Sequence, residues 1–164
     1  MTISTRLNPN ELIIKSIPPN EVDAFIDILG HRDTENHVCN TLIAPLVSKE
    51  EAHYIAYLYG NPISIGYIHV YFPLQDDILW IQTFIINEAF IRKGFGTAFF
   101  NQIIDLFTKR IAINTLYLSC HAANTGGMLF WESLGFKKRT NLTKIAEINN
   151  GQTQAIIYEK KCTH

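Results

Sequence analysis

The stretch Ile91-Arg92-Lys93-Gly94-Phe95-Gly96-Thr97 places two glycines, spaced by one residue, between an apolar segment and an amphipathic one. Glycine has no Cβ, so a turn at this point can adopt positive φ and let a ligand approach the main chain. The first N–H groups of a helix have no acceptor inside it, and the helix dipole and two cationic side chains add positive charge. The stretch therefore predicts a site for an anion such as a pyrophosphate, although a Gly-x-Gly pair can also be only a tight turn.

The segments on either side favour the site over the plain turn. Upstream, Ile78–Ile86 is almost continuously apolar, which is typical of a strand buried on both faces of a sheet. Downstream, apolar residues recur at helical spacing from Ala98 to Ile111. Neither common nucleotide fingerprint fits, because a dinucleotide loop needs a third glycine where Phe99 stands and a mononucleotide loop ends in Gly-Lys-Ser/Thr. We therefore expect a different phosphate-bearing ligand.

Length and composition predict one globular domain, residues 1–164. Hydrophobic residues make up 47% of the chain and charged residues 18%, which is ordinary globular composition. The formal net charge of −1 provides no general attraction to nucleic acid or to an anionic membrane. The first residues lack the plan of a secretion signal, and no apolar run approaches the roughly 20 residues of a membrane-spanning helix. We expect a cytoplasmic protein that binds neither nucleic acid nor membrane.

The cysteines indicate free thiols. Cys39, Cys120 and Cys162 are odd in number and far apart, so neither a disulfide framework nor a paired-cysteine zinc site is indicated. His31 and His37 lie near Cys39, but this group lacks a second clustered pair of ligands and is explained by a polar loop. We expect no metal.

Hydrophobic periodicity and turn residues divide the chain into strands and helices. Strands are predicted over Glu11–Ile17, His53–Tyr59, Ile63–Phe72, Ile78–Ile86, Asn114–His121, Lys137–Ile148 and Thr153–Lys160. Helices are predicted between Asn20 and Gly30, over Ala98–Ile111 and over Asn124–Leu134, with a short helical turn at Ser48–Glu51. Hairpin turns are predicted at Gly60-Asn61-Pro62 and Asn149-Asn150-Gly151. Together they predict an α/β domain with a mixed, mainly antiparallel sheet of about six to seven strands and about four helices on its faces.

The chain carries two local signatures in a fixed order. The first is the pair of glycines in Ile91–Gly96, and the second is Leu116–His121, then Asn124, then Phe130–Phe136 with its Gly-Phe end. They resemble signatures of the Gcn5-related N-acetyltransferases (GNAT), which move an acetyl group from acetyl-coenzyme A (acetyl-CoA) to an amine. The resemblance covers nearly the whole chain and includes a glycine, Gly66, similar to that of the family's third strand. Ile91 departs from the pattern, because it stands where the family usually has Arg or Gln.

The resemblance implies where coenzyme A binds. Its pyrophosphate would be held by main-chain N–H groups of Arg92, Lys93, Gly94, Phe95, Gly96 and Thr97. The strand Phe84-Ile85-Ile86 would splay away from its parallel neighbour, pair with the pantetheine arm and polarise the thioester carbonyl, while its side chains can still belong to the core. Asn124 is expected either to contact the pantetheine amides or to cap the helix that follows.

Acetyl transfer needs a neutral amine, and therefore a base or a desolvating pocket. The candidate base is Glu88, at the end of the apolar strand. A solvated turn explains Glu88 equally well, and no residue stands out. Further candidates, two of which can instead be ordinary hydrogen-bonded strand histidines, are His69, His121, Asp76 and Asp77.

The departing sulfur lacks the family's usual acid. Trp131 stands where many relatives have a tyrosine thought to protonate that sulfur, and indole cannot supply the proton. A thiol of pKa near 8.5 is already a fair leaving group, so this change should slow transfer without preventing it. We expect Trp131 to pack against the coenzyme arm or the core.

Two functions follow. The leading hypothesis is an acetyl-CoA dependent N-acetyltransferase in which a small-molecule or peptide amine attacks directly in a ternary complex, with an acceptor surface near 31–47 and Asp76. The alternative, motivated by Ile91 and Trp131, is a non-catalytic module that binds or senses acyl-CoA. A homodimer through the C-terminal strands is left open.

Overall fold

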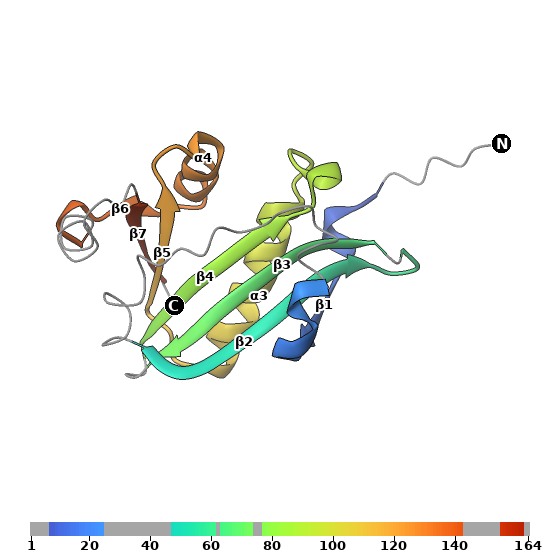
Figure 1. Ribbon diagram of the computed structural model, residues 1–164, viewed down its shortest axis with the longest axis horizontal. Coiled ribbons are helices and arrows are strands. Elements are labelled where there is room, and N and C mark those ends of the chain that lie inside the picture. The colour runs from blue at the N-terminus through green and yellow to red at the C-terminus, as the bar shows by residue number, and fades with distance from the viewer. Residues whose placement is uncertain (1–6, 25–46, 62, 74–76, 143–154, 163–164) are drawn as a thin grey trace.

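The protein is built around a twisted seven-stranded sheet (Figure 1). The computed structural model describes residues 7–24, 47–61, 63–73, 77–142 and 155–162. The strands are β1 (Leu12–Ile17), β2 (Val47–Leu58), β3 (Ser64–Pro73), β4 (Ile78–Ile86), β5 (Thr115–His121), β6 (Lys137–Lys138) and β7 (Ala155–Lys161). Their order in the sheet is β1-β2-β3-β4-β5-β7-β6, and only β4 and β5 pair in parallel. The predicted mixed, mainly antiparallel sheet is confirmed.

Two α-helices whose full length is described pack beside this sheet. They are α3 (Phe95–Arg110) and α4 (Thr125–Ser133), and three short 3-10 helices accompany them: η1 (Pro9–Glu11), η2 (Pro19–Glu21) and η3 (Glu88–Phe90). Figure 1 shows α3 lying along one face of β2, β3 and β4. Its buried residues Phe99, Phe100 and Ile103 join the core formed by that face of the strands. The amphipathic pattern downstream of the glycines thus marks the contact of α3 with the sheet.

The hairpin between β2 and β3 has the predicted turn, with Gly60 at φ 75°. The predicted helical turn at Ser48–Glu51 is wrong, because these residues belong to β2, where Glu51 pairs with Tyr71. Local preference for helix in this short charged segment is overridden by strand pairing with β3. An irregularity in the register between Val47 and Glu51 accompanies this pairing.

The C-terminal part departs from the prediction at one strand. β6 stops at Lys138 and residues 140–142 are helical, so the strand predicted over Lys137–Ile148 is wrong at 139–142, whereas 143–148 lie outside the described residues. β7 lies between β5 and β6, which leaves β6 as a short strand at the edge of the sheet. The predicted turn at 149–151 lies outside the described residues, as do Phe25 to Gly30 of the first predicted helix and nearly all of 31–47.

Candidate functional site

The turn Ile91–Gly94 joins η3 to α3 and has unusual backbone geometry. Arg92 has φ 61° and Gly94 has φ 83°, so two left-handed residues alternate with ordinary ones. Such alternation turns successive N–H groups toward one concave side, a geometry that binds anions. The first main-chain bond of α3 runs from Ala98 N to Gly94 O at 3.1 Å, so the N–H groups of Phe95, Gly96 and Thr97 have no acceptor inside the helix. The turn therefore has the donors that an anion site requires.

The two cations of this turn are used differently. Lys93 Nζ donates a hydrogen bond to Ala89 O at 3.0 Å, so its ammonium folds back over η3. Arg92 is exposed and free to reach a ligand at the surface. Ile91, which stands in place of the family's Arg or Gln, is 45% exposed. Side-chain charge at the turn therefore comes mainly from Arg92, and the main chain supplies the other donors.

Gly96 brings this turn against the end of β4. A Cβ at Gly96 would lie 3.2 Å from the ring of Phe130 on α4 and 3.4 Å from Ile86 Cγ1 on β4. Both distances are at or below the ordinary range of van der Waals contacts, so a larger residue would push α3 away from its neighbours. The start of α3 and the end of β4 therefore approach each other closely. This places the turn Ile91–Gly94, named the anion turn below for its unpaired N–H groups, beside Ile86.

β4 and β5 separate on the way to this turn. Their parallel pairing ends at Ile81 and Leu118, whereas β4 continues to Ile86 and β5 to His121 (Figure 1). On its other side β4 stays paired with β3 as far as Ile86. The main chain of Phe84–Ile86 therefore has no strand partner in β5 and offers one edge to an extended ligand.

The side chains of Phe84, Ile85 and Ile86 pack into hydrophobic clusters on the two faces of the sheet while that edge remains open. Phe84 stacks on Phe99 and Phe130, with ring centroids 5.4 and 5.6 Å apart. Ile86 packs against the same core, and Ile85 points to the opposite face of the sheet. Core packing and an open main-chain edge thus occur together in this strand.

Trp131 is buried in an aromatic cluster, with 7% of its surface exposed. Its ring lies edge-on to Phe84, Phe100 and Phe136 at centroid distances of 5.2, 5.8 and 5.3 Å. α4 ends at this cluster, because Phe136 N donates to Trp131 O and Gly135 N to Glu132 O, the paired bonds of a helix end closed by glycine. Trp131 therefore packs in the core, which is one of the two places expected for it.

Asn124 caps α4, because its side-chain oxygen accepts a hydrogen bond from Gly127 N at 2.9 Å. The amide nitrogen of the same side chain is left for another contact at this exposed position.

The residues considered as a base lie at several places. Glu88 lies in η3 directly after β4 and its side chain is exposed. His121 is exposed at the end of β5, where its Nδ1 accepts from Ala123 N at 3.1 Å. Asp77 is exposed, and Asp76 lies outside the described residues.

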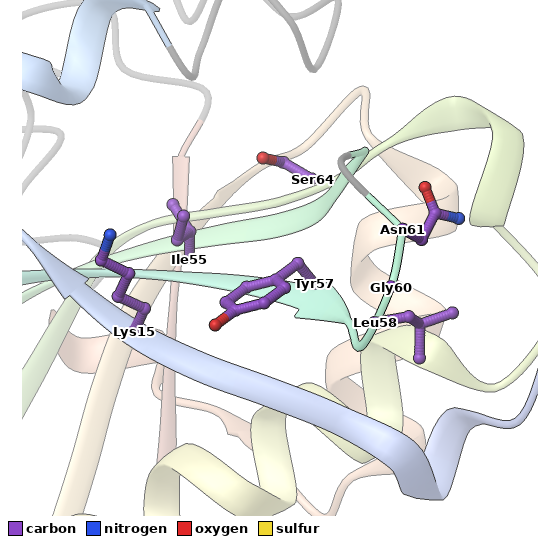
Figure 2. Close-up of a pocket in the computed structure, with 7 residues that line it drawn as sticks. All are labelled: Lys15, Ile55, Tyr57, Leu58, Gly60, Asn61 and Ser64. Atoms are coloured by element: carbon purple, nitrogen blue, oxygen red, sulfur yellow. The ribbon is translucent and has the colours of Figure 1, made fainter.

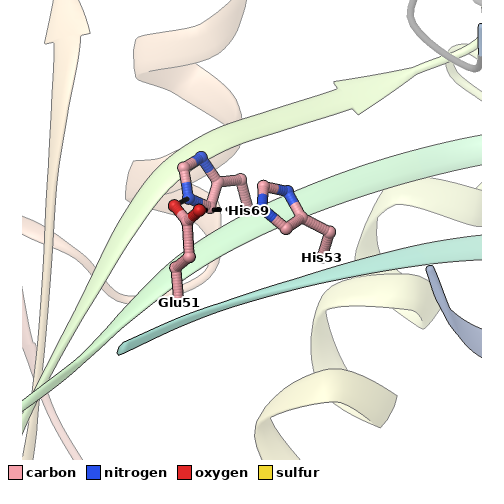
Figure 3. Close-up of side chains that lie close together, drawn as sticks. All are labelled: Glu51, His53 and His69. Atoms are coloured by element: carbon pink, nitrogen blue, oxygen red, sulfur yellow. Dashed lines mark hydrogen bonds and ion pairs between the residues drawn. The ribbon is translucent and has the colours of Figure 1, made fainter. Parts of the chain in front are cut away.

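A group of side chains that the sequence analysis did not bring together lies on the sheet face opposite α3. Glu51 and His53 of β2 meet His69 of β3, with His53 and His69 directly paired in the register (Figure 3). His69 Nε2 lies 2.6 Å from Glu51 Oε2. Burial, together with the neighbouring His53, lowers the pKa of His69 below its usual value, against the opposing effect of Glu51. The group becomes visible only from the strand register. A helical turn at Ser48–Glu51, as predicted, would not have placed Glu51 in the same strand as His53.

A surface hollow of about 440 Å³ lies near the hairpin of β2 and β3 (Figure 2). Its lining residues are Lys15, Ile55, Tyr57, Leu58, Gly60, Asn61 and Ser64. None of the residues predicted for coenzyme or catalysis lines it. It is therefore separate from the anion turn and from the open edge of β4.

Comparison with known proteins identifies the class. The family model of the acetyltransferase (GNAT) domain matches residues 22–157, so the chain belongs to the GNAT acetyltransferases. No curated protein sequence matches it. None of the described helices combines the length and apolar composition needed to span a bilayer.

Solved structures of this class share the fold. The ribosomal-protein-S18-alanine N-acetyltransferase from Escherichia coli is 19% identical, with a TM-score of 0.65 over 93% of this chain and 95% of that one. Ard1 from Thermoplasma volcanium is 15% identical, with a TM-score of 0.64 over 94% and 99%. PaiA N-acetyltransferase from Thermoplasma acidophilum, solved in complex with coenzyme A, is 13% identical, with a TM-score of 0.62 over 92% and 99%. At these identities the likeness concerns the fold.

Proposed function

We propose that the chain transfers an acetyl group from acetyl-CoA, its cosubstrate, to a primary amine of a small molecule or a peptide. The observation that carries this proposal is the position of the anion turn directly beside the open edge of β4. Membership of the GNAT family supports it, and PaiA, a relative in fold, was solved with coenzyme A. The reaction is a direct attack of the amine on the thioester in a ternary complex.

In this proposal the coenzyme lies along two main-chain surfaces. The N–H groups of Arg92 to Thr97 hold the pyrophosphate at the start of α3, where the helix dipole adds to the attraction. The pantetheine arm lies along Phe84–Ile86 in the manner of an added strand. The amide nitrogen of Asn124 donates to the arm from the start of α4. Main-chain N–H groups can bind the pyrophosphate whichever side chain stands at position 91, so the aliphatic Ile91 does not oppose this binding.

The chemistry requires a neutral amine. With a pKa of about 10.4, roughly one lysine-like amine in 2,500 is neutral at pH 7, which costs about 4 to 5 kcal/mol. We assign the base to Glu88, whose exposed carboxylate at the end of β4 accepts the proton through water. The amine nitrogen bonds to the carbonyl carbon, the C–S bond breaks, and its electron pair leaves with the sulfur. Trp131 offers no proton, so the thiolate takes one from solvent.

The test follows coenzyme A thiol released from acetyl-CoA with a panel of polyamines, aminoglycosides and peptides. We expect turnover above background with at least one amine class. A matched pair of variants locates the coenzyme, because Gly94→Ala and Gly60→Ala both add a Cβ at positive φ without a clash. The Cβ at Gly94 would lie 3.7 Å from Pro9 Cγ, an ordinary contact, and the Cβ at Gly60 has nothing within 4 Å. The two substitutions should introduce similar backbone strain. Only Gly94→Ala should weaken coenzyme A binding in calorimetry, by tenfold or more. Equal binding by both variants would contradict the placement of the coenzyme.

The packing of Trp131 favours one second candidate, a non-catalytic acyl-CoA binding module. A buried indole at the family's tyrosine position leaves the sulfur without its usual acid. This candidate predicts that acetyl-CoA binds in calorimetry while no amine releases thiol. Calorimetry and the thiol assay on one protein preparation therefore separate the two functions.

A further inference from the structure

Glu51, His53 and His69 form a compact set of metal-binding atoms on the sheet face opposite α3. The two histidine rings stack with centroids 4.2 Å apart. One carboxylate oxygen of Glu51 and one ring nitrogen of each histidine all lie within 4.8 Å of one another. For comparison, ligand atoms of a tetrahedral Zn²⁺ site with bonds of 2.0 to 2.1 Å are about 3.4 Å apart. To bind one ion, the three side chains would have to rotate from separations of up to 4.8 Å to about that spacing.

A second observation concerns a buried ring nitrogen of His53. Its side chain is only 7% exposed, and its Nε2 is a buried polar atom without a hydrogen-bond partner. The carboxylate of Glu51 is close by, with Oε1 3.5 Å from that nitrogen. A buried polar atom without a partner costs about 1 to 3 kcal/mol, so such an atom is rare in a folded protein. A metal ion bonded to His53 Nε2 would satisfy it.

The other nitrogen of His53 is already held in the way that metal ligands need. His53 Nδ1 and the Tyr67 hydroxyl lie 2.7 Å apart. When Nδ1 carries the ring proton and donates it to Tyr67, the lone pair of Nε2 points toward Glu51 and His69. Metal-binding histidines almost always have such a partner on the second nitrogen, which fixes the tautomer and the ring orientation.

We propose that Glu51, His53 and His69 bind one divalent transition-metal ion of the Zn²⁺ type. Two imidazoles and one carboxylate suit Zn²⁺ better than Mg²⁺ or Ca²⁺, which prefer oxygen ligands. Three protein ligands leave a fourth position for water or another group. The expectation of no metal considered only His31, His37 and Cys39, and the proposed site uses none of them. It is independent of the proposed acetyl transfer.

The experiment uses the full chain without a polyhistidine tag, stripped with a chelator and titrated with Zn²⁺ in a calorimeter. Co²⁺, which gives a visible absorption band when four-coordinate, serves as a spectroscopic probe of the same site. We expect one Zn²⁺ per chain and a band with Co²⁺, and no comparable binding of Mg²⁺. Glu51→Gln, His53→Gln and His69→Gln should each weaken Zn²⁺ binding at least tenfold and remove the Co²⁺ band.

His121→Gln is the matched control, because His121 is an exposed strand histidine outside the set. It should bind Zn²⁺ as the parent chain does. Glu51 has a third of its side chain exposed, so Glu51→Gln should fold even if the buried His53→Gln does not, and circular dichroism checks each variant. If the parent chain does not bind Zn²⁺, the three residues form an ion-pair group only and the proposal is overturned. Unchanged binding by Glu51→Gln and His69→Gln would place the ion elsewhere and overturn it as well.

Discussion

Gly66 lies at a close approach of β3 to both β4 and α3. A Cβ at this position would lie 2.9 Å from both Ile86 Cδ1 and Phe99 Cδ1, and 3.0 Å from Ile85 O. Main-chain oxygen cannot move aside as the end of a flexible side chain can. The glycine that resembles one in the family's third strand is therefore required by packing, and that packing positions Ile86 beside the anion turn.

Gly66→Ala is predicted to lower the free energy of unfolding by about 1 to 3 kcal/mol, the usual cost of overpacking a core. Chemical denaturation followed by circular dichroism measures the change. The matched control is Gly126→Ala on α4, where an added Cβ has nothing within 4 Å. That substitution should leave stability unchanged or raise it by up to about 1 kcal/mol, because alanine favours helix. Equal effects of the two substitutions would contradict the packing role of Gly66.

The pairing of β5 and β7 is reinforced by one ionised side chain. Glu159 on β7 lies opposite Tyr117 on β5, whose hydroxyl donates to Glu159 Oε2 at 2.5 Å, and Arg139 Nη1 lies 2.6 Å from the same oxygen. Burial alone would raise the pKa of Glu159, but the bonds from Tyr117 and Arg139 outweigh it and leave that pKa below its usual value. The folded state therefore favours the charged carboxylate.

The lowered pKa of Glu159 predicts that the fold loses stability in acid. A carboxyl whose folded pKa lies below its unfolded pKa stabilises the fold above the unfolded value of about 4.3, and the contribution is lost as the pH falls through the folded value. Glu159→Gln should cost roughly 1.5 to 3 kcal/mol at pH 7, typical of hydrogen bonds to a charged group. The difference between parent and variant should shrink below pH 4, as measured by urea denaturation across pH. A difference that stays constant with pH would contradict ionisation as its source.

At the scale of the whole molecule, the candidate site depends on three elements meeting at one end of the sheet. The start of α3, the free edge of β4 after Ile81 and Phe130 of α4 meet there, since a Cβ added at Gly96 would lie 3.2 Å from Phe130 and 3.4 Å from Ile86. A ligand that bridges these elements binds only the folded chain. Its binding should therefore appear as added global stability.

Coenzyme A at a concentration about 100 times its Kd should stabilise the chain by about 2.7 kcal/mol. For a chain of this size that corresponds to a rise of about 5 to 10 °C in Tm, measured by differential scanning calorimetry. Adenosine at the same concentration lacks the pyrophosphate and should give little rise. An equal rise with adenosine would show that the anion turn does not contribute to binding.

Features that depend on neighbours in the chain could be predicted from the amino-acid sequence alone. The anion turn with its two glycines, the apolar strand before it, the hairpin at Gly60 and the end of α4 at Gly135 were all predictable. Each follows from local chemistry: glycine at positive φ, unpaired N–H groups at a helix start, and hydrophobic periodicity. The same local signals identified the family.

Features that depend on contacts between distant segments are visible only in the folded chain. Strand pairing with β3 placed Glu51 in β2, where local preference predicted a helical turn, and that register brought His53 against His69. Packing against Phe84 and Phe100 made Trp131 a core residue. Pairing register and side-chain packing are set by the free energy of the whole fold, which no short window of sequence contains.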